Sequence, residues 1–159
     1  MKQKITIISL LVLAVIGTMQ SCKKEKGTEN VEKNETKVST NGDNNSHNTG
    51  QNCMSCHKQG GSGEGWFTVA GSVYDSLKTS AYPNSTVKLY TGPNGTGTLK
   101  YTIPADGLGN FYTTASIDFA GGLYPSIQGS LVTKYMSSTI TTGQCNSCHG
   151  VSTDKLWTK

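Results

Sequence analysis

Between residues 66 and 135, short segments of alternating apolar and polar residues follow one another with turns between them. Residues 86–90 read Thr-Val-Lys-Leu-Tyr and place Val87 and Leu89 on one face, and residues 98–103 alternate in the same way. A period of two is typical of a half-buried β-strand. Aromatic and β-branched residues mark further expected strands at residues 66–74, 111–114, 117–119 and 124–135. We therefore predict a mainly β fold, with a small β-sandwich over residues 66–135.

The composition agrees with this prediction. The 159 residues allow one ordinary domain, and 19 of them are glycine, which suits a chain with many turns. Only 34% of the residues are hydrophobic and arginine is absent, so the composition disfavours a long helical bundle or a coiled coil.

Residues 1–21 have the pattern of an export signal. Lys2 and Lys4 precede an apolar stretch at residues 5–16, which is too short to span a bilayer, and the small residue Ser21 ends the segment. Removal of this segment takes two lysines with it and lowers the formal net charge from +4 to +2. The remaining chain has no basic patch for nucleic acid.

The junction before Cys22 resembles a bacterial lipobox. The resemblance implies that Cys22 is lipidated and becomes the mature N-terminus of an exported protein. Such a protein is anchored to the bacterial outer membrane, on its periplasmic or its cell-surface face. Several acyl chains hold a small protein firmly, at roughly 0.8 kcal/mol per buried methylene. The alternative is an ordinary secretory peptide followed by a chance cysteine.

Residues 22–52 form a polar stretch of Lys, Glu, Asn, Thr, Ser and Gly. With almost no apolar side chains, this stretch cannot bury enough surface to offset the entropy lost on ordering. We therefore predict a flexible tether, which spans roughly 30 Å on average and holds the folded part clear of the membrane.

Two motifs with the pattern C-x-x-C-H lie at residues 53–57 (the first motif) and 145–149 (the second motif). This pattern is the attachment frame of c-type haem. Its two thiols each form a thioether with one vinyl group, and the histidine that follows places its imidazole under the iron. The sequence therefore predicts two covalently bound haem c groups, attached through Cys53, Cys56, Cys145 and Cys148 and ligated by His57 and His149.

Three other uses of these cysteines explain less of the pattern. A four-cysteine zinc site would have to bridge the 88 residues between Cys56 and Cys145, far more than in a zinc ribbon. Two disulfides in an exported protein have three possible connectivities. A thioredoxin-like redox pair needs only one motif, together with a βαβ pattern. None of these uses explains why a histidine follows both pairs.

Through these two motifs the chain resembles the multihaem c-type cytochromes of bacterial envelopes. The resemblance implies an electron carrier with haem-binding segments at residues 53–65 and 136–159. It also implies redox partner proteins in the electron-transport chain of the envelope.

The second axial position of each iron has few candidate ligands. Outside the signal, the histidines and methionines not yet assigned are His47, Met54 and Met136. Met54 lies inside the first C-x-x-C loop, at the edge of the macrocycle, and cannot reach the far face of that haem. His47 and Met136 are therefore the candidate sixth ligands, and either could reach either haem. The alternative is a solvated His47 and a Met136 that fills a gap in the β-domain.

A second resemblance concerns the segment between the motifs. Residues 69–75, 84–90 and 105–112 follow the order of a G-x-V strand, a small-residue-then-V strand and a D-x-x-G-x-F turn. They are similar to carboxypeptidase-regulatory-like, transthyretin-type β-sandwiches. Domains of this kind are usually scaffolds or adhesion modules without catalytic residues, so the fold alone does not define a function.

Together these features favour electron transfer by a lipid-anchored dihaem cytochrome that is not an enzyme and has no nucleic-acid partner. No nucleophile–base pair can be assembled, because two of the three histidines are assigned to haem. Two alternatives stay open. One is a haem peroxidase or small-molecule reductase with one open coordination site. The other is a β-sandwich surface adhesion module in which the cysteines form disulfides.

Overall fold

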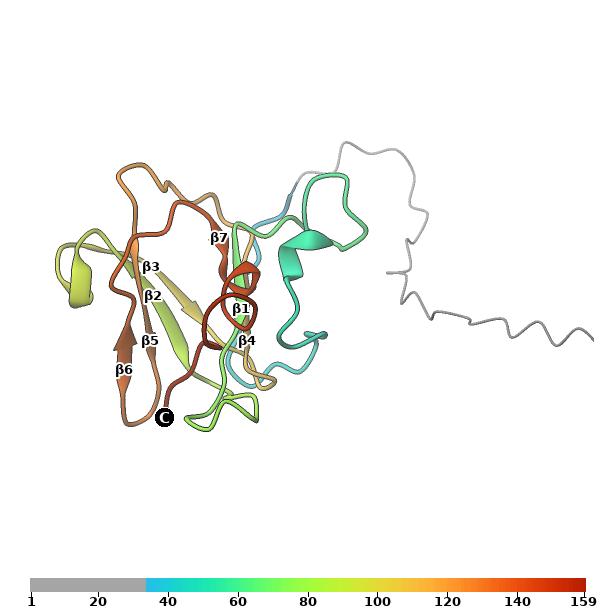
Figure 1. Cartoon of the computed structure of the whole chain (residues 1–159). Coiled ribbons are helices and arrows are strands. Elements are labelled where there is room, and N and C mark those ends of the chain that lie inside the picture. Colours follow the sequence, from blue (N-terminus) through green and yellow to red (C-terminus); the bar gives the residue numbers. More distant parts are fainter. Residues whose placement is uncertain (1–33) are drawn as a thin grey trace, which may run out of the picture.

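The computed structural model describes residues 34–159, which form two β-sheets packed face to face (Figure 1). The smaller sheet has the strand order β4-β1-β7, and the larger sheet has the order β3-β2-β5-β6. The strands are β1 (Val69–Ser72), β2 (Thr86–Tyr90), β3 (Leu99–Pro104), β4 (Asn110–Thr113), β5 (Tyr124–Gln128), β6 (Thr133–Tyr135) and β7 (Gly143–Gln144). Short 3-10 helices are η1 (Cys53–Ser55), η2 (Pro93–Gly95) and η3 (Cys145–Ser147). The predicted mainly β fold is confirmed.

Alternating residues of the strands form the core between the sheets. In β2, Val87 and Leu89 are buried while Thr86, Lys88 and Tyr90 are half-buried, as the period of two predicts. Ile103 of β3 and Phe111 of β4 belong to the same cluster. Burying such a side chain stabilises the fold by roughly 1.5–3 kcal/mol relative to leaving it exposed. This cluster therefore supports the scaffold that carries the two motifs.

Residues 117–119 form no strand, so this part of the strand prediction is wrong. Ile117 and Phe119 still pack against the core as partly buried side chains. The backbone turns here because Gly121 and Gly122 follow, with φ angles of 79° and 77° that glycine adopts readily. The apolar side chains of residues 117–119 thus correctly predicted contact with the core, but they did not predict the conformation of the backbone.

Strand β1 is the central strand of the smaller sheet, and all of its residues are buried. It pairs antiparallel with β4, where Gly71 lies opposite Phe111, and parallel with β7. A Cβ atom on Gly71 would lie 2.6 Å from the Phe111 ring and 2.9 Å from Cβ of Cys145. Glycine at this position therefore lets a cysteine of the second motif pack against the core.

The tether predicted for residues 22–52 is wrong for the part that the structure describes. Residues 34–52 include a segment along the open edge of β4, where Val38 forms a bridge with Thr113. The N–H of Ser39, a buried residue, donates to a carbonyl of β4 at 3.0 Å. Composition reports only the capacity for apolar burial, whereas backbone pairing with an edge strand needs no apolar side chain.

The signal at residues 1–21, the lipidation of Cys22 and the tether up to residue 33 lie outside the described residues and stay predictions. Within residues 34–159, the structure contains no helix with the length and hydrophobicity needed to cross a membrane.

The C-terminal residues 136–159 are part of the sandwich and do not form a separate flank. Ile140 forms a bridge with Leu123 at the start of β5, and β7 joins the smaller sheet. Further along, Trp157 forms a bridge with Tyr74. The sandwich therefore extends past the boundary predicted at residue 135, and the second motif is built into it.

Candidate functional site

The two motifs fold in the same way. In the first motif, the N–H groups of Cys56 and His57 donate to the carbonyl of Cys53 at 3.2 and 3.0 Å and close η1. In the second motif, the corresponding distances are 3.3 and 3.0 Å and close η3. Side chains three residues apart are eclipsed in a 3-10 turn. The two cysteines of each pair therefore lie on one side of their turn.

A serine completes each turn in the same way. The hydroxyl of Ser55 donates to the carbonyl of Asn52 at 2.7 Å, and that of Ser147 donates to the carbonyl of Gln144 at 2.6 Å. Each serine occupies the third position of its C-x-x-C pair. The two motifs therefore resemble each other in more than their cysteines and their histidine.

Each motif histidine uses one ring nitrogen within the protein. Nδ1 of His57 lies 2.8 Å from the carbonyl oxygen of Glu64, and Nδ1 of His149 lies 2.8 Å from that of Asp154. A carbonyl oxygen can only accept, so in this arrangement Nδ1 carries the proton and Nε2 keeps its lone pair. Histidines that bind metals have this arrangement, because the bond at one nitrogen fixes the ring and raises the basicity of the other.

The two acidic residues that supply these carbonyls are also held by lysines. Nζ of Lys37 lies 2.7 Å from the carboxylate of Glu64, and Nζ of Lys78 lies 2.6 Å from that of Asp154. The hydrogen bond from Lys37, together with its charge, lowers the pKa of Glu64. Each ion pair ties the loop after a motif histidine to a distant segment of the chain.

The His57 ring is enclosed on three sides. Phe67 stacks on one face at 4.1 Å between ring centres. A Cβ atom on Gly63 would lie 2.7–2.9 Å from three ring atoms, and because Phe67 fills one face, Gly63 lies against the other. The carbonyl of Glu64 occupies the Nδ1 side. The bond at Nδ1 leaves Nε2 as the ring nitrogen that can bind a metal.

His47 lies beside His57, with 5.7 Å between the ring centres and a tilt of 36° between the ring planes. Metal–imidazole bonds are about 2 Å long, so two ligands in line across one metal place their ring centres roughly 6 Å apart. The observed separation is close to this value. The structure thus brings together the first motif and one of the two candidate sixth ligands.

Met136 has different surroundings. It follows β6, the edge strand of the larger sheet, and its N–H donates to the carbonyl of Pro125 at 3.0 Å. The second motif follows β7, which belongs to the smaller sheet, and the ring of His149 forms hydrogen bonds within its own loop. The geometry supports a ligand role for His47 and gives no such support to Met136.

Cys53, Cys145 and Cys148 carry free thiols, so no disulfide joins the four motif cysteines to one another. Burial raises the pKa of Cys145 to about 12, and the nearby Cys53 thiol adds to this shift. Burial also raises the pKa of Cys53. Both thiols are therefore neutral at pH 7, whereas a zinc ligand or a catalytic cysteine acts as the thiolate.

The two motifs lie side by side, and both η1 and η3 contact β1 (Figure 1). The side-chain amide of Asn52 donates to that of Gln144 at 3.4 Å. The side-chain amide of Asn146 donates to the carbonyl of Gln51 at 3.0 Å. Residues that precede one motif therefore contact residues in or before the other, although more than ninety positions separate them.

Three buried polar residues in or near the motifs were not predicted from the sequence as part of the site. They are Ser72, Asn110 and Asn146, which are 1%, 3% and 4% exposed. The Ser72 hydroxyl donates to Asn110 at 2.6 Å and accepts from the Asn146 amide at 3.1 Å. The sequence offered only a weak signal, an asparagine at a variable position of the second C-x-x-C pair.

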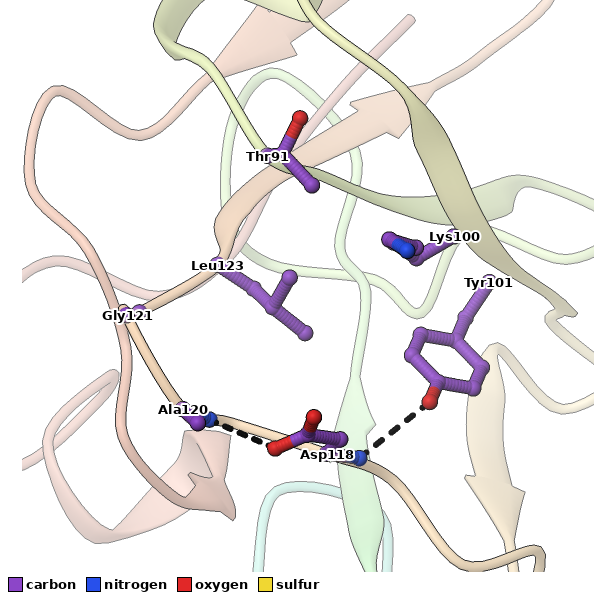
Figure 2. Close-up of a pocket in the computed structure, with 8 residues that line it drawn as sticks. Thr91, Lys100, Tyr101, Asp118, Ala120, Gly121 and Leu123 are labelled. Atoms are coloured by element: carbon purple, nitrogen blue, oxygen red, sulfur yellow. Dashed lines mark hydrogen bonds between the residues drawn. The ribbon is translucent and has the colours of Figure 1, made fainter.

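A separate hollow of about 350 Å³ lies in the larger sheet, between β3 and the loop that leads into β5 (Figure 2). The N–H of Asp118 donates to the Tyr101 hydroxyl at 3.2 Å, and the Asp118 carboxylate accepts the N–H of Ala120 at 2.8 Å. These polar groups are used within the protein, and the two motifs contribute no residue to the lining.

Within residues 34–159, no three His, Cys, Asp or Glu side chains gather as a metal site requires. A four-cysteine zinc site would be such a group. The finding does not bear on haem, because the macrocycle itself holds the iron and the protein adds only the axial ligands.

Comparisons with known proteins found no match for this chain among protein-family models, curated proteins or solved structures.

Proposed function

We propose that this protein is a lipid-anchored dihaem c-type cytochrome that transfers single electrons in a bacterial envelope. The observation that carries the proposal is the repeated geometry of the two motifs. Each forms the same 3-10 turn, and each histidine places Nδ1 2.8 Å from a backbone carbonyl. The motifs lie in different parts of the chain, so chain connectivity does not impose this likeness. A shared ligand chemistry accounts for it.

The residues present fit a covalent haem at each motif. Cysteines on one side of a 3-10 turn match two vinyl groups of one macrocycle. Each S–H adds across one vinyl double bond, so the sulfur gains a bond to carbon and the hydrogen passes to the neighbouring carbon. The neutral, half-buried thiols of Cys53 and Cys145 are compatible with this end state, because a thioether carries no charge.

The roles of the residues follow from this fit. Cys53 and Cys56 hold the first haem and Cys145 and Cys148 the second, with His57 and His149 as proximal ligands. When bound, the haem iron supplies the one-electron change between Fe(II) and Fe(III). The chain orients the ligands: the carbonyl of Glu64 and the stacked Phe67 fix the His57 ring. His47 is the proposed sixth ligand of the first haem, and ligation by Met136 stays a prediction.

Location and partners complete the proposal. Lipidation at Cys22 would hold the protein at the outer membrane, on its periplasmic or cell-surface face. We expect redox proteins of the envelope electron-transport chain as partners, no nucleic acid, and the role of an electron carrier, not of an enzyme.

The alkaline pyridine haemochrome spectrum of the full chain, produced in cells with a haem-maturation system, tests the proposal. We expect two c-type haems per chain. A chain without haem, in which mass spectrometry finds two disulfides, would instead leave the adhesion module as its function.

A second candidate function, a peroxidase or small-molecule reductase, is favoured by the placement of Met136 just after β6, beside the sheet opposite to the second motif. An iron with one protein ligand keeps a position for a small molecule. Binding of one equivalent of carbon monoxide by the reduced protein at neutral pH would support this candidate. Absence of binding would favour electron transfer alone.

A further inference from the structure

Asn146 belongs to the second motif, yet its side chain is tied to the first. Its Oδ1 accepts the N–H of Ser72 at 3.1 Å. Its amide hydrogens go to the Ser72 hydroxyl at 3.1 Å and to the carbonyl of Gln51 at 3.0 Å. Gln51 lies two positions before the first motif. A side chain of the second motif therefore holds the backbone that leads into the first.

The network continues from Ser72 into the same backbone. The Ser72 hydroxyl accepts the N–H of Gly50 at 2.8 Å and donates to Oδ1 of Asn110 at 2.6 Å. The amide of Asn110 donates to the hydroxyls of Ser46 and Thr49 at 2.8 and 2.9 Å. Every side-chain donor and acceptor of the two asparagines is used. A buried network that is fully satisfied favours one geometry, because any displacement leaves a polar group unpaired.

These contacts converge on residues 46–51, which we call the His47 loop. The loop is anchored at Ser46, Thr49, Gly50 and Gln51. The side chain of His47 is itself exposed, so the anchored backbone of the loop determines where its imidazole lies. That imidazole is the one found 5.7 Å from the His57 ring.

We infer that Asn146 is a positioning residue for the first haem, and that it acts from within the second motif. Through Ser72 and Asn110 it holds the His47 loop in the place where His47 can ligate the iron opposite His57. The inference rests on the proposed function. It adds that ligation at one haem depends on a side chain that lies between the two cysteines of the other.

The test uses the full chain with both haems and compares the wild type with Asn146→Ala and Ser72→Ala. Ser126→Ala is the matched control, because Ser126 is a strand serine that is 1% exposed, like Ser72, but it lies in β5 of the larger sheet and not in the network that holds the His47 loop. Haem content per chain is measured first. The number of low-spin ferric haems is then counted by electron paramagnetic resonance, and cyanide binding is titrated.

We expect two haems per chain in all four proteins. Asn146→Ala and Ser72→Ala should each lose at least half of one low-spin haem per chain and bind correspondingly more cyanide, whereas Ser126→Ala should match the wild type. Added imidazole should restore the low-spin signal in the affected variants, because it replaces a ligand that is displaced and not a haem that is lost.

Several results would overturn the inference. One is a wild-type low-spin count in both network variants, and another is a wild type with two haems of which neither is low-spin. If Asn146→Ala does not fold, Ser72→Ala decides alone, since it removes a single oxygen and with it the hydroxyl that joins Asn146 to Asn110 and to the N–H of Gly50. A wild type without haem would instead overturn the proposed function, so the two failures are distinguishable.

Discussion

The two motifs have the same backbone turn and the same histidine hydrogen bond, but they differ in what surrounds them. The first motif presents His57 between Phe67 and Gly63, with a second histidine nearby. The second motif is built into the sandwich: Cys145 packs against the core, and Asn146 is buried. The same local structure thus lies once beside a second histidine and once against the core of the sandwich.

In the proposed dihaem protein, this difference separates two requirements of a redox centre. The turn and the Nδ1 bond prepare the proximal ligand, and both sites meet that requirement. The sixth ligand and the polarity around the iron set the potential and the access of small molecules, and here the sites diverge. Two haems with equal attachment and unequal potentials are the expected result.

Loss of a whole haem is the largest effect that would test the comparison. Replacing Cys53 and Cys56 with alanine, or Cys145 and Cys148, should remove one of the two covalent haems in each case. Haem staining after denaturing electrophoresis measures the content. The second double variant should also melt at a lower temperature than the first, because only Cys145 packs against the core cluster. Two haems retained in either variant would contradict the assignment.

Removal of a sixth ligand should affect only one iron. His47→Ala should convert the first haem from low to high spin and let it bind cyanide, since no other histidine is available to replace it. Met136→Ala serves as the comparison: if Met136 is the ligand that the sequence predicts, this variant should lower the potential of one haem only and remove a methionine-to-iron charge-transfer band. Two unchanged potentials in Met136→Ala would contradict ligation by Met136.

Two glycine substitutions compare the surroundings of the first motif, at the His57 ring, with those of the second motif, at the core of the sandwich. Alanine at Gly71 meets Phe111 and Cys145, and we expect a loss of about 1–3 kcal/mol in the free energy of unfolding. Alanine at Gly63 meets the His57 ring, so it should shift the spectrum of the first haem. Urea unfolding and absorption spectra measure both effects. A larger spectral change in Gly71→Ala than in Gly63→Ala would contradict the comparison.

The sequence predicted the parts of this molecule that depend on local pattern. Strand β2 lies where the alternation of residues 86–90 placed it. The two C-x-x-C-H frames identified the residues of the candidate site, although the turn that they share came from the structure. The tertiary partners of polar residues were not predictable. Ser39 pairs with an edge strand, and Asn146 donates a hydrogen bond to Gln51, more than ninety positions earlier in the chain. Neither a serine nor an asparagine indicates in the sequence which group it will contact. Hydrogen bonds of this kind depend on the folded geometry and leave no period in the sequence.

The smallest expected effect concerns the ion pairs beside the two histidines. Glu64→Gln breaks the contact with Lys37, and Asp154→Asn breaks the equivalent contact with Lys78. The side chain of Glu64 is 86% exposed and that of Asp154 is 77% exposed. Solvent and salt screen such pairs, so each change should cost less than about 1 kcal/mol of unfolding free energy at pH 7.

The pH dependence distinguishes the Glu64 pair from a packing effect. Lys37 lowers the pKa of Glu64 below its ordinary value of 4.5 in the folded protein. The pair therefore stabilises the fold above pH 4.5, and this contribution is lost as the pH falls through the lowered pKa. The difference in unfolding free energy between wild type and Glu64→Gln should vanish at acid pH and shrink in high salt. A difference that persists at acid pH would show that the glutamine disturbs the loop itself, and with it the carbonyl that holds His57.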